Sequence, residues 1–124
     1  MTWTTDGVRA IVPILRMYDL AATRRFYLDY LGFSEVHLAD SSDGPAYLIV
    51  ALGPVRLHLS SHHGDGTPGT AVLIVTGELD ALHSTLASKG YPYMNPGIDP
   101  APGGGRQVVV LDPAGNELRF YEPS

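Results

Sequence analysis

The side chains best suited to chemistry gather in one segment near the middle of the chain. His58, His62, His63 and Asp65 lie close together in the sequence, and imidazole and carboxylate groups are common metal ligands. However, residues 62–66 are rich in turn-forming types, where polar side chains are expected without any metal. Consecutive histidines on an extended chain also point to opposite sides. The pattern therefore favours a polar loop over a metal site.

The composition excludes other kinds of chemistry and of partner. The 124 residues include no cysteine, so there is no disulfide, thiolate metal ligand or cysteine nucleophile. The net charge of −5 argues against nucleic acid, because phosphate binding needs clustered Lys and Arg. The same charge mildly favours a cationic small ligand, although solubility alone also explains it. No apolar run is long enough to span a membrane, and we expect a cytoplasmic protein with no membrane partner.

Apolar periodicity divides the chain into strands and two helices. Asp19 is a candidate N-cap for a helix that runs to about Leu31 and ends at Gly32. The second helix is expected over 78–89, before Gly90. The expected strands cover residues 10–18, 33–38, 45–51, 55–60, 71–75, 107–111 and 117–121.

The two halves of the chain repeat one order of elements. The spacing from Asp19 to Gly32 equals that from Gly77 to Gly90, and an aromatic residue follows Gly32 and Gly90. Each half then closes with two strands joined by a turn that contains Gly or Pro. These matches indicate a duplicated βαβββ unit. The predicted fold class is α+β, as one domain over 1–124 with module one at about 9–61 and module two at about 69–122.

The last strand of each module has one polar side. The alternating polar residues are Arg56, His58 and Ser60 in module one and Glu117, Arg119 and Tyr121 in module two. If each helix covers one face of its sheet, the polar faces would line a cleft. The same alternation also describes any strand with one face in water.

Motifs spread along the chain together resemble one family. Residues 12–20, Phe26-Tyr27 and Leu31-Gly32-Phe33 are similar to the opening of vicinal oxygen chelate proteins, and residues 112–118 to their closing hairpin. Residues 57–69 and 93–98 resemble the bleomycin-resistance-like members of that superfamily. The resemblance covers residues 10–122. It implies a cupped mixed sheet built from two βαβββ modules, with the helices on the outer face.

Enzymes of this superfamily, such as glyoxalase I and extradiol dioxygenases, resemble one another in holding a divalent metal on the inner face of the sheet. The positions that match their ligands are Val12 and Thr70 on the first strands and His58 and Arg119 on the last strands. Only His58 is a good ligand, because Val12 has no donor and Arg119 carries a fixed positive charge. A catalytic site usually has three protein ligands, so we expect neither a metal nor another cofactor.

Bleomycin-resistance-like proteins are similar in acting by sequestration, with two grooves between the subunits of a homodimer that hold a large cationic glycopeptide unaltered. The resemblance therefore favours a metal-independent antibiotic-binding homodimer over an enzyme. The candidate groove residues are Tyr47, His58, Ser60, His62, His63, Asp65, Tyr93, Met94, Arg106, Arg119 and Tyr121. Each also has a structural explanation, such as dimer packing for Tyr93 and Met94, or pairing of Arg119 with Glu117 or Glu122.

One loop departs from the pattern of the subgroup. Members often carry an aromatic ring after the Pro-Gly-Ile segment, where it stacks on the planar part of the drug, whereas residues 101–106 read Ala-Pro-Gly-Gly-Gly-Arg. Loss of a stacking ring costs about 1–3 kcal/mol, which is roughly a tenfold to hundredfold loss of affinity. The departure argues against bleomycin itself while leaving room for another ligand.

Two other functions stay open. A metal-dependent lyase, isomerase or dioxygenase of the same superfamily with an unusual site would carry stoichiometric metal that is lost on His58→Ala. An accessory dimer without a small ligand would fill its cleft with its own side chains. The sequence also leaves open whether the modules pair within one chain or by exchange between chains.

Overall fold

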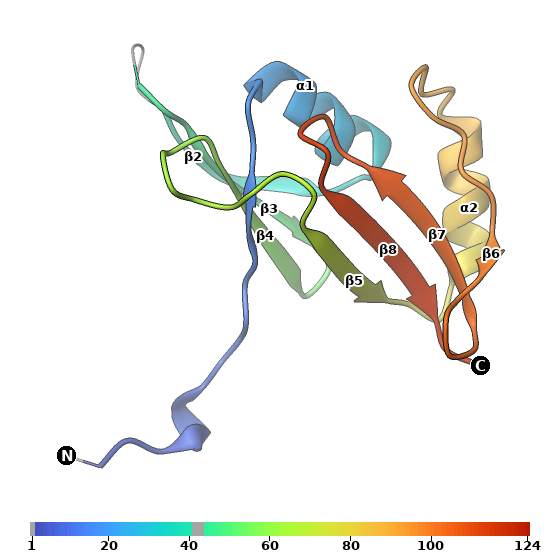
Figure 1. Cartoon of the computed structure of the whole chain (residues 1–124), viewed down its shortest axis with the longest axis horizontal. Helices are drawn as coiled ribbons and strands as arrows, with labels where there is room; N and C mark the ends of the chain where they lie inside the picture. The colour runs from blue at the N-terminus through green and yellow to red at the C-terminus, as the bar shows by residue number, and fades with distance from the viewer. Residues whose placement is uncertain (1, 41–43) are drawn as a thin grey trace.

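The computed structural model describes residues 2–40 and 44–124, and it contains two four-stranded sheets that lie side by side (Figure 1). In the first sheet, β1 (Ile14–Arg16) is parallel to β4 (Val55–Ser60), and β3 (Tyr47–Leu52) and β2 (Ser34–Ala39) follow antiparallel. In the second sheet, β5 (Ala71–Val75) is parallel to β8 (Glu117–Glu122), and β7 (Arg106–Leu111) and β6 (Asp99–Pro100) follow antiparallel. The predicted α+β fold with a repeated βαβββ order is confirmed.

The first helix begins where the sequence predicts but changes its winding. Asp19 caps α1 (Leu20–Arg24) through Oδ1, which accepts the Ala22 N–H at 3.1 Å. The helix continues as the π-helical segment η2 (Arg25–Tyr30), a rare and wider winding. Its buried residues are Phe26, Tyr27 and Tyr30. This segment therefore contributes three aromatic side chains to the core.

The second helix follows the prediction more closely. α2 (Leu79–Ser88) buries Leu79 and Leu86, and Gly90 then takes the left-handed conformation, with φ at 65°. The two helices, which carry these apolar stripes, leave the opposite face of each sheet uncovered by helix (Figure 1). No helix among the described residues is long and apolar enough to cross a membrane.

Two expectations about strands differ from the structure. The first strand was expected over 10–18 but covers only Ile14–Arg16, because Pro13 cannot donate a ladder hydrogen bond. Residues 2–13 instead form an arm that contains the short helix η1 (Thr5–Gly7) and runs away from the sheets (Figure 1). The short strand β6 (Asp99–Pro100) was not expected, because its two residues show no alternation and one of them is proline.

A buried polar network joins the two halves of the chain. Asp112 Oδ1 accepts the backbone N–H groups of Ala114 at 2.9 Å and Asn116 at 2.8 Å, which closes the β7–β8 turn. Asp112 Oδ2 accepts the Tyr27 hydroxyl at 2.7 Å and the Asn116 amide at 2.9 Å. The same amide donates to the Arg16 carbonyl at 2.8 Å. A buried carboxylate needs this full set of donors, so the turn of the second half is fixed against β1 and η2 of the first.

Removing the Tyr27 hydroxyl should destabilise the fold. Tyr27→Phe leaves Asp112 Oδ2 with one donor fewer at a site where water does not reach, and should lower the free energy of unfolding by about 1–3 kcal/mol. Chemical denaturation followed by circular dichroism measures it. The matched control is Tyr18→Phe, at a side chain that is 65% exposed, which should change stability by less than about 0.5 kcal/mol. Equal effects of the two substitutions would contradict the role of the network.

The loop after β4 folds back over β1. Gly66 has a φ of 66°, and a Cβ atom there would lie 2.6 Å from the Arg16 backbone nitrogen. Only glycine allows so close an approach between two backbone segments. The loop is thereby held against the end of β1, directly over the polar residues at the end of β4.

A paired substitution tests this contact. Gly64→Ala and Gly66→Ala both place a Cβ atom at positive φ, which costs about 1–2 kcal/mol, but the space at Gly64 is open. The clash at Gly66 should add about 1–3 kcal/mol. Denaturation of both variants measures the difference, and equal stabilities would show that the loop moves away freely.

Candidate ligand-binding site

The strand register sets which side chains occupy the uncovered face of each sheet, called here the open face. In the first sheet Tyr47 pairs with Ser60 and Ile49 with His58, and Ile14 and Arg16 continue this face on β1. In the second sheet the open face carries Gln107, Val109, Arg119 and Tyr121, with Leu73 and Val75 beside them on β5. Residues that alternate with these, such as Leu57, Leu59, Leu118 and Phe120, are buried under the helices.

Tyr47 and His58 form the most chemically capable pair on the first open face. The Tyr47 hydroxyl and His58 Nδ1 are 2.6 Å apart, and the two rings meet edge to face. Burial, together with the negative charge of Asp65, raises the pKa of Tyr47, so the phenol keeps its proton. Which of the two groups donates this hydrogen bond depends on the tautomer of His58. The pair presents a polar, orientable contact to a ligand.

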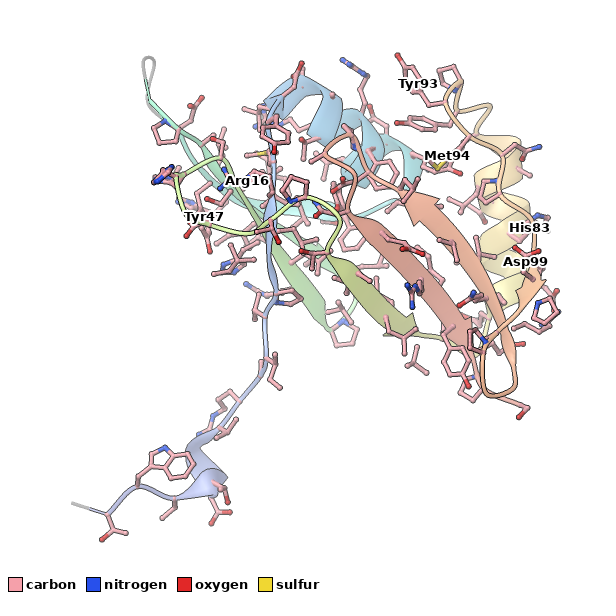
Figure 2. All side chains as sticks on the ribbon, in the orientation of Figure 1. Arg16, Tyr47, His83, Tyr93, Met94 and Asp99 are labelled. Atoms are coloured by element: carbon pink, nitrogen blue, oxygen red, sulfur yellow. The ribbon has the colours of Figure 1, made fainter. Side chains whose placement is uncertain are left out.

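The other polar residues near β4 are mostly used inside the loop. Ser60 is fully buried and donates to Asp65 Oδ2 at 2.8 Å, so its hydroxyl is not presented on the open face. Arg16 donates to the His62 carbonyl at 2.8 Å, and the His62 ring lies edge-on to Tyr47. His63 is exposed on the loop. The structure thus brings Tyr47, His58, His62 and Asp65 into one neighbourhood beside Arg16, as Figure 2 shows for Tyr47 and Arg16.

A groove of about 320 Å³ lies on the second open face. Its lining residues are Leu73, Ala101, Pro102, Gln107, Arg119 and Tyr121. Arg119 is held by Glu117, with Nε to Oε1 at 3.1 Å, and the Tyr121 hydroxyl donates to the Gly104 carbonyl at 3.2 Å. The loop over residues 101–106 packs tightly at Gly105, because a Cβ atom there would overlap the Glu122 carbonyl. Apolar walls and fixed polar groups are the usual features of a small-molecule site.

Three of the candidate groove residues lie away from the open faces. Arg106 is on the helix side of the second sheet, where it pairs with Asp80 of α2 at 3.0 Å and with Glu122 of β8. Alternation along β7 (Arg106–Leu111) places Arg106 on the opposite face of the sheet from Gln107. Tyr93 and Met94 lie beside α2, far from Tyr47 (Figure 2).

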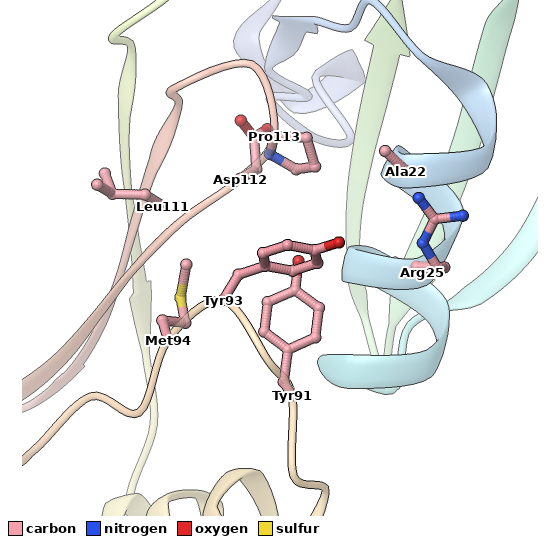
Figure 3. A pocket seen from close by; sticks show the side chains of 8 residues that line it. All are labelled: Ala22, Arg25, Tyr91, Tyr93, Met94, Leu111, Asp112 and Pro113. Atoms are coloured by element: carbon pink, nitrogen blue, oxygen red, sulfur yellow. The ribbon is translucent and has the colours of Figure 1, made fainter.

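Tyr93 and Met94 line a separate cleft between the two halves of the chain, called here the junction cleft (Figure 3). Its volume is about 310 Å³, and its walls come from α1, η2, the segment after α2 and the end of β7. The lining residues are Ala22, Arg25, Tyr91, Tyr93, Met94, Leu111, Asp112 and Pro113. No residue of this cleft belongs to the groove on the second open face.

The four positions that match the metal ligands of the superfamily do not suit a divalent cation. The Arg119 guanidinium occupies one of them and is paired with Glu117. The Thr70 hydroxyl already donates to the Thr67 carbonyl at 2.8 Å, and Val12 has no donor atom. His58 alone is a good ligand. Within residues 2–40 and 44–124, no group of three or more His, Cys, Asp or Glu side chains is placed to hold a metal ion.

Some site residues were missed by the sequence interpretation although a signal existed. Gln107 precedes the alternating Val108 and Val110, which are buried, so period-two reasoning places it on the open face. The same reasoning applies to Arg16 beside buried Leu15 and Met17. The junction cleft had no such signal, because its residues come from both halves of the chain.

Comparison with solved structures supports the fold. TnmS3, an antibiotic-binding protein from Streptomyces sp. CB03234, aligns with a TM-score of 0.71 and 21% identity over 95% of this chain and 98% of its own. The bleomycin resistance determinant encoded on transposon Tn5 gives 0.69 and 21% over 94% and 99%. Lactoylglutathione lyase from Agrobacterium tumefaciens gives 0.69 and 19% over 92% of both chains. At these identities the likeness establishes the fold alone.

The search of curated proteins found no significant match. The family model described as glyoxalase superfamily protein, in contrast, matches residues 1–124. The resemblance to vicinal oxygen chelate proteins is therefore confirmed at the level of the superfamily. The chain belongs to the glyoxalase superfamily.

Proposed function

We propose that this chain is a metal-independent binding protein that sequesters an antibiotic-like small molecule, of the bleomycin type, in a groove between two copies of the chain. The observation that carries the proposal is Arg119. Arg119 occupies one of the four positions that match the metal ligands of superfamily enzymes, and its guanidinium lies beside an apolar groove. Such a site can position a ligand by hydrogen bonds but does not supply a Lewis acid.

The groove on the second open face has the features of a site that binds a ligand and leaves it unaltered. Leu73, Pro102 and the Tyr121 ring supply apolar walls, while Gln107 and Arg119 supply polar anchors. The Ser60 hydroxyl, a potential nucleophile near the first open face, is buried and bonded to Asp65. Two solved proteins of the same fold are described as an antibiotic-binding protein and a bleomycin resistance determinant, which supports this choice of ligand class.

Charge is compatible with a cationic ligand at long range. Glu117 neutralises Arg119 within the groove, so the net charge of −5 sets the field that an approaching molecule meets. Close to the groove, selectivity then depends on the planar and apolar parts of the ligand. Tyr121 is the ring best placed to replace the aromatic residue that the loop over 101–106 lacks, because it lies against Gly104 and Gly105.

The apolar side chains that this fold leaves in water support a second copy of the chain as the partner that covers them. Leu73 and Val75 on the edge strand β5 are 55% and 62% exposed, and Ile11 on the arm is 94% exposed. A hollow of about 540 Å³ separates the arm from β4 and β5. An exposed apolar edge strand is normally covered by another chain or element, and a homodimer would cover β5 and the arm together.

Titration of the protein with metal-free and copper-loaded bleomycin by calorimetry tests the ligand. We expect saturable binding near one drug per chain, with the drug recovered unaltered. Tyr121→Ala should weaken binding roughly tenfold to a hundredfold if the ring stacks on the drug. Tyr18→Ala removes an exposed ring outside the groove and should change nothing. No heat at high drug concentration would exclude bleomycin as the ligand.

Sedimentation of charged variants tests the dimer. Introducing Leu73→Glu and Val75→Glu together should convert the dimer into a folded monomer, because buried unpaired charges are costly at an interface while both positions tolerate charge in water. Val36→Glu, at another exposed apolar position on a strand, is the matched control and should remain dimeric. A wild-type protein that sediments as a monomer at micromolar concentration contradicts this part of the proposal.

A further inference from the structure

The junction cleft is a second hollow that the antibiotic-binding proposal does not use. It opens beside a smaller hollow of about 250 Å³ that shares Arg25, Tyr91 and Tyr93. Together they form an aromatic-lined surface at the boundary between η2 and the segment that follows α2. Both volumes are near the lower limit for ligand pockets in proteins, so this surface suits a small molecule and not a glycopeptide.

Aromatic rings dominate the walls. Tyr30 and Tyr91 are stacked with centroids 4.3 Å apart, and Tyr93 meets Tyr91 edge-on at 5.2 Å. Tyr93 is nevertheless 72% exposed, so most of its ring faces the cleft mouth and solvent. Figure 3 shows Tyr93 between Met94 on one side and Arg25 on the other. A flat ring entering the cleft would contact Tyr93, the Met94 thioether and Pro113, which are favourable partners for an aromatic group.

The cleft also carries a cation without a partner. Among the described residues Arg25 forms no ion pair, whereas Arg24, Arg106 and Arg119 each pair with a carboxylate. Burial, and then Tyr93, raise the pKa of Tyr91, while the Arg25 guanidinium acts in the opposite direction. Arg25 lines the cleft together with Tyr91 and Tyr93. The carboxylates of Asp112 and Asp29 also line the two hollows, but the Asp112 oxygens are already occupied by four hydrogen bonds. The Arg25 guanidinium is therefore available to an anionic group on a ligand whose ring lies against Tyr93.

A buried polar atom gives a second, independent indication. Tyr30 is only 2% exposed, and its hydroxyl has no hydrogen-bond partner among the described residues. Tyr30 lines the smaller hollow next to Arg25. Buried hydroxyl groups are nearly always bonded, so an acceptor atom that reached the Tyr30 hydroxyl after a small movement of the wall would satisfy a group that the chain alone leaves unsatisfied.

We infer that the junction cleft binds a small planar aromatic anion, with its ring against Tyr93 and Met94 and its carboxylate or phenolate on Arg25. This site is independent of the groove on the second open face, since the two share no lining residue. It adds a second ligand class, anionic and small, to a chain whose proposed main ligand is large and cationic.

The test uses 2-naphthoate and its neutral counterpart 2-naphthalenemethanol, titrated into the full-length protein and followed by amide chemical shifts. We expect 2-naphthoate to saturate with a dissociation constant of about 1 mM or lower, shifting amides of residues 25–30 and 91–94 but not those of β4 or β8. The neutral compound should bind roughly tenfold or more weakly, because it forgoes the charged hydrogen bond to Arg25.

Substitutions assign the contacts. Arg25→Gln should weaken naphthoate binding about tenfold or more and abolish the preference over the alcohol, and Tyr93→Ala should weaken both compounds roughly threefold to tenfold. Arg56→Gln, at an exposed arginine on β4, is the matched control and should leave both affinities unchanged. Arg25→Gln and Tyr93→Ala should bind bleomycin as the wild type does, which separates this site from the groove.

Three results would overturn the inference. The first is an absence of shifts at 10-fold excess over the expected dissociation constant. The second is equal weakening by Arg25→Gln and Arg56→Gln, which would indicate a nonspecific charge effect. The third is a change of oligomeric state on Tyr93→Ala with unaltered naphthoate binding, which would show that a second copy of the chain occupies the cleft.

Discussion

The buried carboxylate of Asp112 is the interaction on which the arrangement of this molecule depends. Its two oxygens accept four hydrogen bonds, from the Ala114 and Asn116 backbone, the Asn116 amide and the Tyr27 hydroxyl. A charge that is 6% exposed is tolerated only when it is satisfied in this way. Because Tyr27 belongs to η2 and Asn116 also binds the Arg16 carbonyl, the closing turn of the second half is fixed to the first half. Burial and the charge of Asp112 raise the pKa of Tyr27, so the donor keeps its proton.

That junction determines which surfaces are left for ligands. With the helices packed on one face of each sheet, the open faces carry Tyr47 and His58 on the first sheet and Arg119 and Tyr121 on the second. The same junction creates the cleft between η2 and residues 91–94, which neither half would form alone. At the four positions that match the metal ligands of the superfamily, this chain carries Val12, Thr70, His58 and Arg119. His58 is the one good ligand among them, whereas a catalytic metal usually needs three.

Local features of the sequence predicted the elements well. The cap at Asp19, the glycines at 32 and 90 and the alternation in β4 and β8 each report backbone conformation or burial of a single segment, and all were confirmed. The first strand was too long in the prediction, because hydrophobicity alone does not distinguish a strand from an apolar arm. The π-helical winding of η2 also had no sequence signal, since it depends on how three aromatic side chains fit one core.

The site was harder to predict than the fold because its contacts cross the chain. Alternation indicated that His58, Arg119 and Tyr121 share open faces, and it would have added Gln107. It could not show that Ser60 is covered by a loop held through Gly66, or that Arg106 pairs with Asp80 of α2. These outcomes depend on a close backbone approach and on the position of a helix, which are set only when the whole chain has folded.

Native mass spectrometry of the metal-stripped protein mixed with metal-free bleomycin tests the central claim most directly, because one spectrum reports subunit number, ligand number and ligand mass. The account predicts a dimer carrying two drug molecules of unchanged mass. A drug of altered mass, or a dimer that takes up one zinc or iron ion per chain and loses it on His58→Ala, would contradict it in favour of a metal-dependent enzyme.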